Sequence, residues 1–167
     1  MITLVSFILF CQALGALTGA FATVWGELAY IRAMRDGKID HAEQAHLRII
    51  AHGLRFGMNL LLIASFSLVV IAYQAHATLQ PVLTPSYWTL IVLALLIIYV
   101  SWALSRHHLS FALGSALLFT AWWFLAYLTV GWMPMLSFTA TVAFFVIATG
   151  IFYAILKYAR MLSLGKK

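Results

Sequence analysis

Five long apolar runs, separated by short polar connections, constrain this chain more than any other feature. They cover residues 2–26, 56–73, 88–104, 110–128 and 138–156. At about 1.5 Å per residue, runs of roughly 17–25 residues cross the ~30 Å hydrocarbon core of a bilayer. Backbone polar groups in lipid must be paired within their own segment, so each run is expected to be a helix. The alternating pattern of a membrane barrel is absent.

The composition indicates the same structural class. Hydrophobic residues make up 65% of the chain and charged residues only 8%, whereas soluble domains contain about 25% charged residues. A soluble fold of this length could not bury so much apolar surface. We therefore expect an all-α integral membrane protein, with residues 1–167 forming a single domain of five transmembrane helices. The expected location is the cell membrane, as a multi-pass protein.

The basic residues predict an orientation. All ten Lys and Arg residues lie in alternate connections or near the C-terminus, as Arg32, Arg35, Lys38, Arg48, Arg55, Arg106, Lys157, Arg160, Lys166 and Lys167. This is the positive-inside pattern, and it predicts an N-out/C-in topology with a cytoplasmic helical hairpin over residues 29–55. Anionic lipid headgroups at the cytoplasmic face are the expected partners. The same distribution argues against nucleic-acid binding, despite the net charge of +6.

The turn of this hairpin, residues 36–43, has two readings. Its D-G-x-I-D-x-x-E ending resembles the second half of an EF-hand loop. The positions of the first two ligands hold Arg32 and Met34, which cannot bind calcium. Helix capping is therefore favoured, in which Gly37 ends one helix while Asp40 and Glu43 form a capping box for the next.

Glu27 is the acidic residue that lies nearest to an apolar run. It shares a helix face with other polar or small residues, namely Gln12, Gly19, Thr23 and Tyr30. The second helix has a matching stripe at His41, Arg48, His52, Arg55 and Asn59. A carboxylate at this depth needs a partner or a proton. We expect a polar cluster in which Glu27 pairs with Arg48 or Arg55, the alternative being that Glu27 reaches headgroup water.

Histidines on the same side suggest a second type of site. His52 begins the second run, and His107 and His108 precede the fourth. Two imidazoles could ligate a b-type haem, or a metal ion together with Glu27. Basic side chains would then face the haem propionates, from Arg55, Arg106 or Lys157. The competing interpretation is that these histidines face headgroups.

Small residues spaced four apart predict close helix packing. They are the pairs Gly15 and Gly19, Gly53 and Gly57, and Ser110 and Gly114. Such pairs serve packing within one chain, or contacts in a homo-oligomer or a larger membrane complex. Near the C-terminus, Tyr153, Lys157 and Arg160 share a face that is expected to reach toward lipid phosphate.

The sequence contains no P-loop, dinucleotide fingerprint, zincin motif or nucleophile arrangement. We therefore expect a non-enzymatic role, as an accessory or scaffold subunit or as a binding protein. One alternative is a redox protein that carries haem b or a metal at the histidines. Another is a small transporter or channel, with Glu27 and Arg55 lining a polar path.

Overall fold

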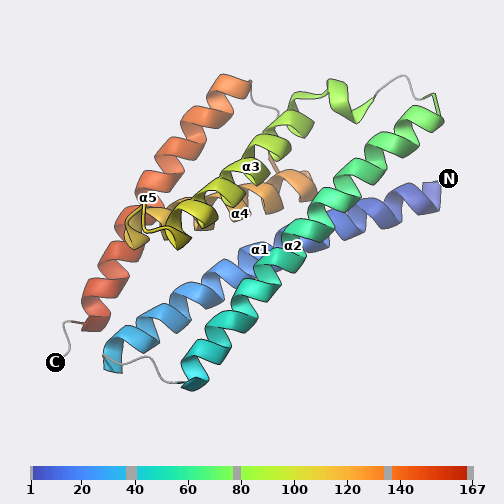
Figure 1. The fold of residues 1–167 in the computed structure, drawn as a ribbon. Coiled ribbons are helices and arrows are strands. Elements are labelled where there is room, and N and C mark those ends of the chain that lie inside the picture. Colours follow the sequence, from blue (N-terminus) through green and yellow to red (C-terminus); the bar gives the residue numbers. More distant parts are fainter. Residues whose placement is uncertain (1, 37–40, 77–79, 134–136, 165–167) are drawn as a thin grey trace.

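The computed structural model describes residues 2–36, 41–76, 80–133 and 137–164, and these segments are helical throughout apart from short connections (Figure 1). The elements are α1 (Ile2–Asp36), α2 (His41–Gln74), the 3-10 turn η1 (Pro81–Leu83), α3 (Pro85–Ser105), α4 (Phe111–Val130) and α5 (Phe138–Leu164). All five α-helices are long and apolar enough to cross a membrane. The predicted all-helical architecture, with five helices long and apolar enough to cross a membrane, is therefore confirmed.

Helix ends form where the sequence supplies turn residues. Pro81 and Pro85 occupy the first turns of η1 and α3, where a missing backbone N–H costs nothing. The Thr84 hydroxyl accepts a hydrogen bond from the Tyr87 N–H and so caps α3. Gly131 ends α4 in the left-handed region, with φ of 78°. These signals set the connections that separate the apolar runs.

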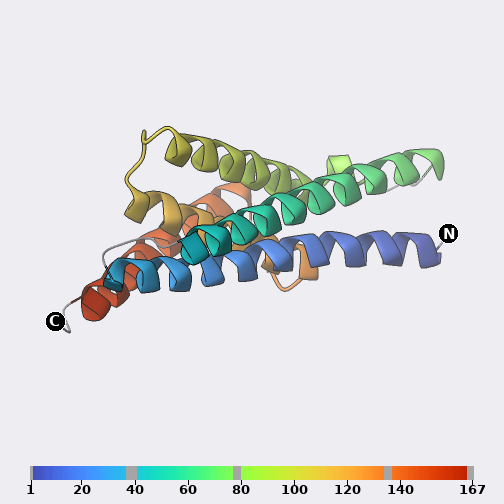
Figure 2. The same cartoon turned by 60° about the horizontal axis from the view of Figure 1, so that its bottom comes forward.

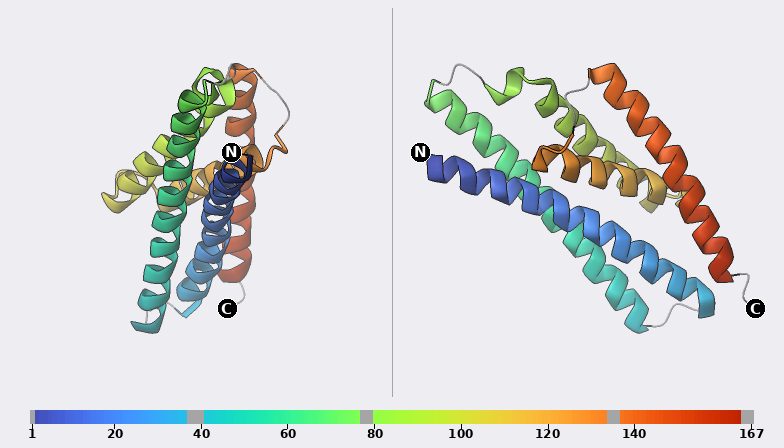
Figure 3. Two further views of the ribbon diagram at one scale, coloured as in Figure 1. Left: turned by 90° about the vertical axis from the view of Figure 1, so that its right-hand side faces the viewer. Right: turned by 180° about the vertical axis from the view of Figure 1, so that it is seen from behind.

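Three helices pack against α4, whereas α2 packs mainly against α1. α1 lies antiparallel to α2 and also contacts α4, while α3 and α5 each pack against α4 (Figure 2). In the most apolar 18-residue window of each helix, 50% of α4 is buried but only 6% of α5. The core is formed by apolar side chains from several helices, among them Ala16, Leu61, Leu93, Trp122 and Leu125. α5 stands at one side of the bundle (Figure 3).

Glycines bring α1 and α2 into backbone contact. A Cβ on Gly15 would lie 2.8 Å from the backbone oxygen of Gly57, and a Cβ on Gly57 would lie 2.7 Å from that of Gly15. A Cβ on Gly19 would overlap the buried ring of Trp122. Gly53 differs, since its added Cβ would meet only the Cβ of Ala22, at 4.0 Å. Of the second pair, only Gly57 is therefore needed for the close approach of α1 and α2.

The pair at the start of α4 packs against a side chain and not against backbone. Ser110 is the N-cap of α4 but makes no side-chain capping hydrogen bond. Gly114 is buried, and its added Cβ would meet the side-chain end of Leu104 at 2.5 Å. This neighbour is flexible, unlike the backbone atoms at Gly15 and Gly57.

Two ends of the bundle can be distinguished. The basic end contains the end of α1, the start of α2, the α3–α4 connection and the end of α5, and the opposite end contains the N-terminus (Figure 1). The described basic side chains belong to the segments at the basic end, as Arg32, Arg48, Arg55, Arg106, Lys157 and Arg160. The predicted capping turn involves residues 37–40 and the side chain of Glu43, which lie outside the described part of the chain.

Candidate functional site

A buried ion pair joins the first helix to the last. Nη2 of Arg160 in α5 donates to both carboxylate oxygens of Glu27 in α1, at 2.8 and 2.7 Å. The two side chains are only 13% and 9% exposed, respectively. The same nitrogen lies 2.6 Å from the Ser115 hydroxyl in α4. One guanidinium therefore connects three helices near the basic end.

Two aromatic rings complete this cluster. The rings of Tyr30 and Phe111 stack with their centroids 4.0 Å apart. The guanidinium carbon of Arg160 lies 5.2 Å from the Tyr30 centroid and 5.1 Å from the Phe111 centroid. Both distances are within the range of cation–π attraction. We refer to Glu27, Tyr30, Phe111, Ser115 and Arg160 as the basic-end cluster.

The partner of Glu27 differs from the one expected. The sequence pattern suggested Arg48 or Arg55, but the ion pair described for Glu27 is with Arg160. Arg48, His52 and Arg55 are exposed on α2. The reason is the rotation of α2, which turns Gly57 and Leu61 toward α1 instead of the basic stripe.

Arg160 also differs from its expected role of reaching toward lipid phosphate, because it turns inward. It continues the partly buried face of α5 that carries Phe145, Thr149, Phe152 and Leu156, at helical spacing. Lys157, which was placed on the same face as Arg160, is exposed. The spacing of Arg160 from these residues was the available sequence signal, but α5 is apolar on all sides and no contrast marked its packing face.

The candidate haem ligands are all exposed, with His52 on α2 and the neighbouring His107 and His108 in the α3–α4 connection. Nδ1 of His52 donates to the Arg48 carbonyl oxygen at 2.7 Å. His108 lies against the Trp102 ring, with the centroids 5.8 Å apart. Among the described residues, no group of three or more His, Cys, Asp or Glu side chains could hold a metal ion. The haem and metal hypotheses therefore gain no support from this geometry.

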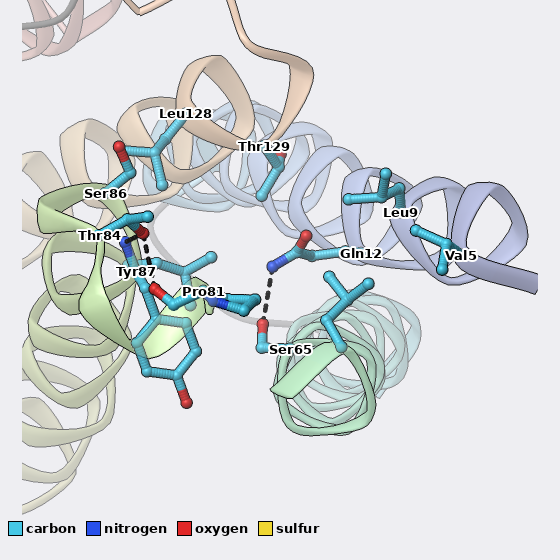
Figure 4. A pocket seen from close by; sticks show the side chains of 12 residues that line it. Val5, Leu9, Gln12, Ser65, Pro81, Thr84, Ser86, Tyr87, Leu128 and Thr129 are labelled. Carbon is cyan, nitrogen blue, oxygen red and sulfur yellow. Dashed lines mark hydrogen bonds between the residues drawn. The ribbon is translucent and has the colours of Figure 1, made fainter. Parts of the chain in front are cut away.

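A cavity of about 420 Å³ lies toward the opposite end of the bundle. Its walls come from α1, α2, η1, α3 and α4, and Figure 4 shows their side chains converging on a shared space. Most of the lining is apolar and includes Val5, Leu9 and Leu68. Two buried polar side chains interrupt it, because Gln12 is 8% exposed and Ser65 is 1% exposed.

These two side chains hold each other in one orientation. The Ser65 hydroxyl donates to the Leu61 carbonyl oxygen at 2.7 Å. A hydroxyl has one hydrogen, so the Ser65 oxygen must accept from its other neighbour, which is Nε2 of Gln12 at 2.8 Å. The Gln12 carbonyl oxygen is thereby directed away from Ser65, on the side of Thr129 (Figure 4).

Sequence reasoning noticed Gln12 but did not assign it to this site, and it missed Ser65 altogether. An amide inside an apolar run was the available signal for Gln12. No such signal marks Ser65. Ser67 lies two residues further along α2, and each of the two serines donates to the carbonyl oxygen four residues before it. Only the packing of α1 on α2 distinguishes the two serines.

No protein-family model matches the chain, and neither a curated protein nor a solved structure matches it. A functional assignment therefore depends on the geometry of the structure itself. Two polar sites then remain as candidates. The basic-end cluster is filled by its own side chains, although Nε of Arg160 has no hydrogen-bond partner among the described residues, whereas the cavity has volume for another molecule.

Proposed function

We propose that this chain is a non-enzymatic binding protein of the cell membrane, which holds a membrane-soluble small molecule in the cavity between α1, α2 and α4. The observation that carries the proposal is the buried Gln12–Ser65 pair inside an otherwise largely apolar space. Sites for small molecules are concave and mostly apolar, with a few polar groups that fix the orientation of the ligand. The volume of about 420 Å³ lies within the usual range of roughly 300–1,000 Å³.

The distribution of charge supports an orientation for this site. With the basic end in the cytoplasm, as the positive-inside pattern favours, the N-terminus lies outside. The cavity is then in the outer half of the bilayer, where it would receive its ligand from the outer leaflet. The exposed Arg48, Arg55 and Arg106 would contact anionic headgroups on the other side.

The basic-end cluster supports binding over transport. A polar path would need Glu27 to face water or a mobile ion. Its carboxylate instead accepts two hydrogen bonds from Arg160, which also bonds Ser115. This arrangement gives Glu27 the role of attaching α5 to α1 and α4, so the second polar site has a structural explanation.

Native mass spectrometry of the protein released from its membrane tests the proposal. We expect a bound amphiphile on the wild-type chain and its loss in Leu68→Trp, which fills the cavity. Ile63→Trp is the matched control, because it adds the same ring to an exposed position of α2. An unliganded wild type, or a ligand retained equally by a folded Leu68→Trp variant, would contradict the proposal.

A further inference from the structure

The walls of the cavity restrict the charge of its ligand. None of the described residues that line it is ionisable near neutral pH. A charged headgroup placed there would lose its hydration without gaining a counter-charge, which is costly in an apolar surrounding. The described Lys and Arg side chains belong to segments at the other end of the bundle, and His76, which follows α2 at this end, is exposed and does not line the cavity. The cavity therefore favours an uncharged molecule.

Three of the five hydroxyl side chains that line the cavity have already used their protons. Ser65 donates to Leu61, Thr84 donates to the Pro81 carbonyl at 2.7 Å, and Thr129 lies within hydrogen-bond distance of two carbonyls of its own helix. A hydroxyl whose hydrogen is occupied can only accept. These side chains therefore present oxygen lone pairs, and Ser86, which also lines the space, is exposed.

The carbonyl oxygen of Gln12 is the central acceptor. The amide nitrogen is directed to Ser65, and no donor among the described residues bonds to the amide oxygen. In Figure 4 this oxygen lies in the space between α2 and α4, and the Tyr87 hydroxyl points away from it. An amide carbonyl in an apolar cavity needs a donor, and leaving it without one is unfavourable. A ligand that supplies one hydrogen would satisfy it.

We infer that the ligand is an uncharged amphiphile with a free hydroxyl group, for which a diacylglycerol is a suitable probe. The hydroxyl donates to the Gln12 amide oxygen, and the hydrocarbon lies along the apolar wall formed by Val5, Leu9 and Leu68. This inference rests on the proposed binding function and adds the chemical class of the ligand.

The test compares three ligands that share the same chains. They are 1,2-dioctanoylglycerol, its 3-acetyl ester, in which the hydroxyl is capped, and dioctanoyl phosphatidic acid, which is charged. Affinities are measured by native mass spectrometry on the full chain in mild detergent. We expect the free hydroxyl to bind about tenfold more tightly than the ester, as one net hydrogen bond allows, and more tightly than the phosphatidic acid.

Two variants locate the effect. Gln12→Met keeps a side chain of similar length without the acceptor, and we expect the preference for the free hydroxyl to fall below about threefold. Gln74→Met makes the same exchange at an exposed position at the end of α2 and should leave the preference unchanged. The wild-type comparison needs no variant, so the test holds even if Gln12→Met folds poorly.

The outcomes separate the two proposals. Equal binding of the alcohol and the ester, or tighter binding of phosphatidic acid, overturns the ligand class while the binding function stands. A preference that persists in a folded Gln12→Met variant also overturns the assignment. Failure of all three ligands, together with a wild-type chain that carries no amphiphile from its membrane, overturns both.

Discussion

Polar side chains are buried at both ends of this bundle, but their surroundings differ. At the basic end, Arg160 bonds to Glu27 and Ser115, and a stacked pair of aromatic rings lies beside its guanidinium. Toward the N-terminal end, Gln12 and Ser65 bond to each other beside about 420 Å³ of open volume, and one amide oxygen remains without a protein donor. A buried polar group can therefore hold helices together or form part of a binding site. The difference lies in whether open volume adjoins the polar groups, since even at the basic end Nε of Arg160 has no hydrogen-bond partner among the described residues.

The Glu27–Arg160 ion pair matters most for the attachment of α5. This helix packs against α4 through aromatic contacts, such as those of Phe145 with Phe124 and of Phe152 with Phe119. Its burial is sparse compared with that of α4. Arg160 adds a link from α5 to both α1 and α4. We expect variants of this cluster to have the largest effect on stability.

Glu27→Gln is therefore the strongest test of the comparison. It leaves the buried Arg160 without a counter-charge, so we expect the free energy of unfolding to fall by about 3–5 kcal/mol. Denaturant unfolding in detergent measures this change. Lys157→Gln is the matched control on α5, because Lys157 is exposed, and its effect should stay within about 0.5 kcal/mol.

A double variant separates the loss of the pair from the cost of an isolated charge. Glu27→Leu combined with Arg160→Met should recover most of the stability that Glu27→Gln loses, since no unpaired charge remains. Unchanged stability in Glu27→Gln would mean that the pair does not fasten α5. In that case the contrast between the two ends would fail, and an ion-conducting role for Glu27 would need testing by flux in liposomes.

The helix crossing between the two ends gives an intermediate effect. Gly57→Ala places a methyl group against the backbone of Gly15, so α1 and α2 must separate. We expect a loss of about 1–3 kcal/mol in the free energy of unfolding. Gly53→Ala has room for its methyl group and should be neutral, or stabilising by up to about 1 kcal/mol. Equal effects of the two variants would show that backbone contact does not set the helix spacing.

The smallest effect is expected at the cavity itself. Ser65→Ala removes the acceptor of the Gln12 amide and should cost about 0.5–1.5 kcal/mol, while weakening ligand binding by releasing the amide. Ser67→Ala removes a similar bond to the helix backbone but has no Gln12 contact. Thermal unfolding with and without ligand distinguishes them. If both serine variants bind the ligand equally well, the Gln12–Ser65 pair does not organise the site.

The helices were predictable because composition and run length determine them in lipid. The partner of Glu27 was not, because it depends on how two helices are rotated against α1. α2 turns Gly57 and Leu61 inward, so its basic stripe faces outward, and α5 turns Arg160 inward. In lipid, polarity does not reveal which face of a helix packs, because lipid tails are as apolar as the side chains of the core. The cavity is lined by residues of five elements, including η1. No local sequence pattern predicts how these elements pack together.

The Glu27–Arg160 pair also affects the order in which the helices assemble. Its partners are separated by 133 positions along the chain, and synthesis adds roughly 5–20 residues per second from the N-terminus. The first helix is therefore made several seconds or more before the guanidinium that neutralises its carboxylate. Until then the Glu27 carboxylate has no counter-charge from α5, and we expect it to stay near the membrane surface. Arrival of α5 supplies the counter-charge, so assembly of the five-helix bundle is complete only once α5 has been made.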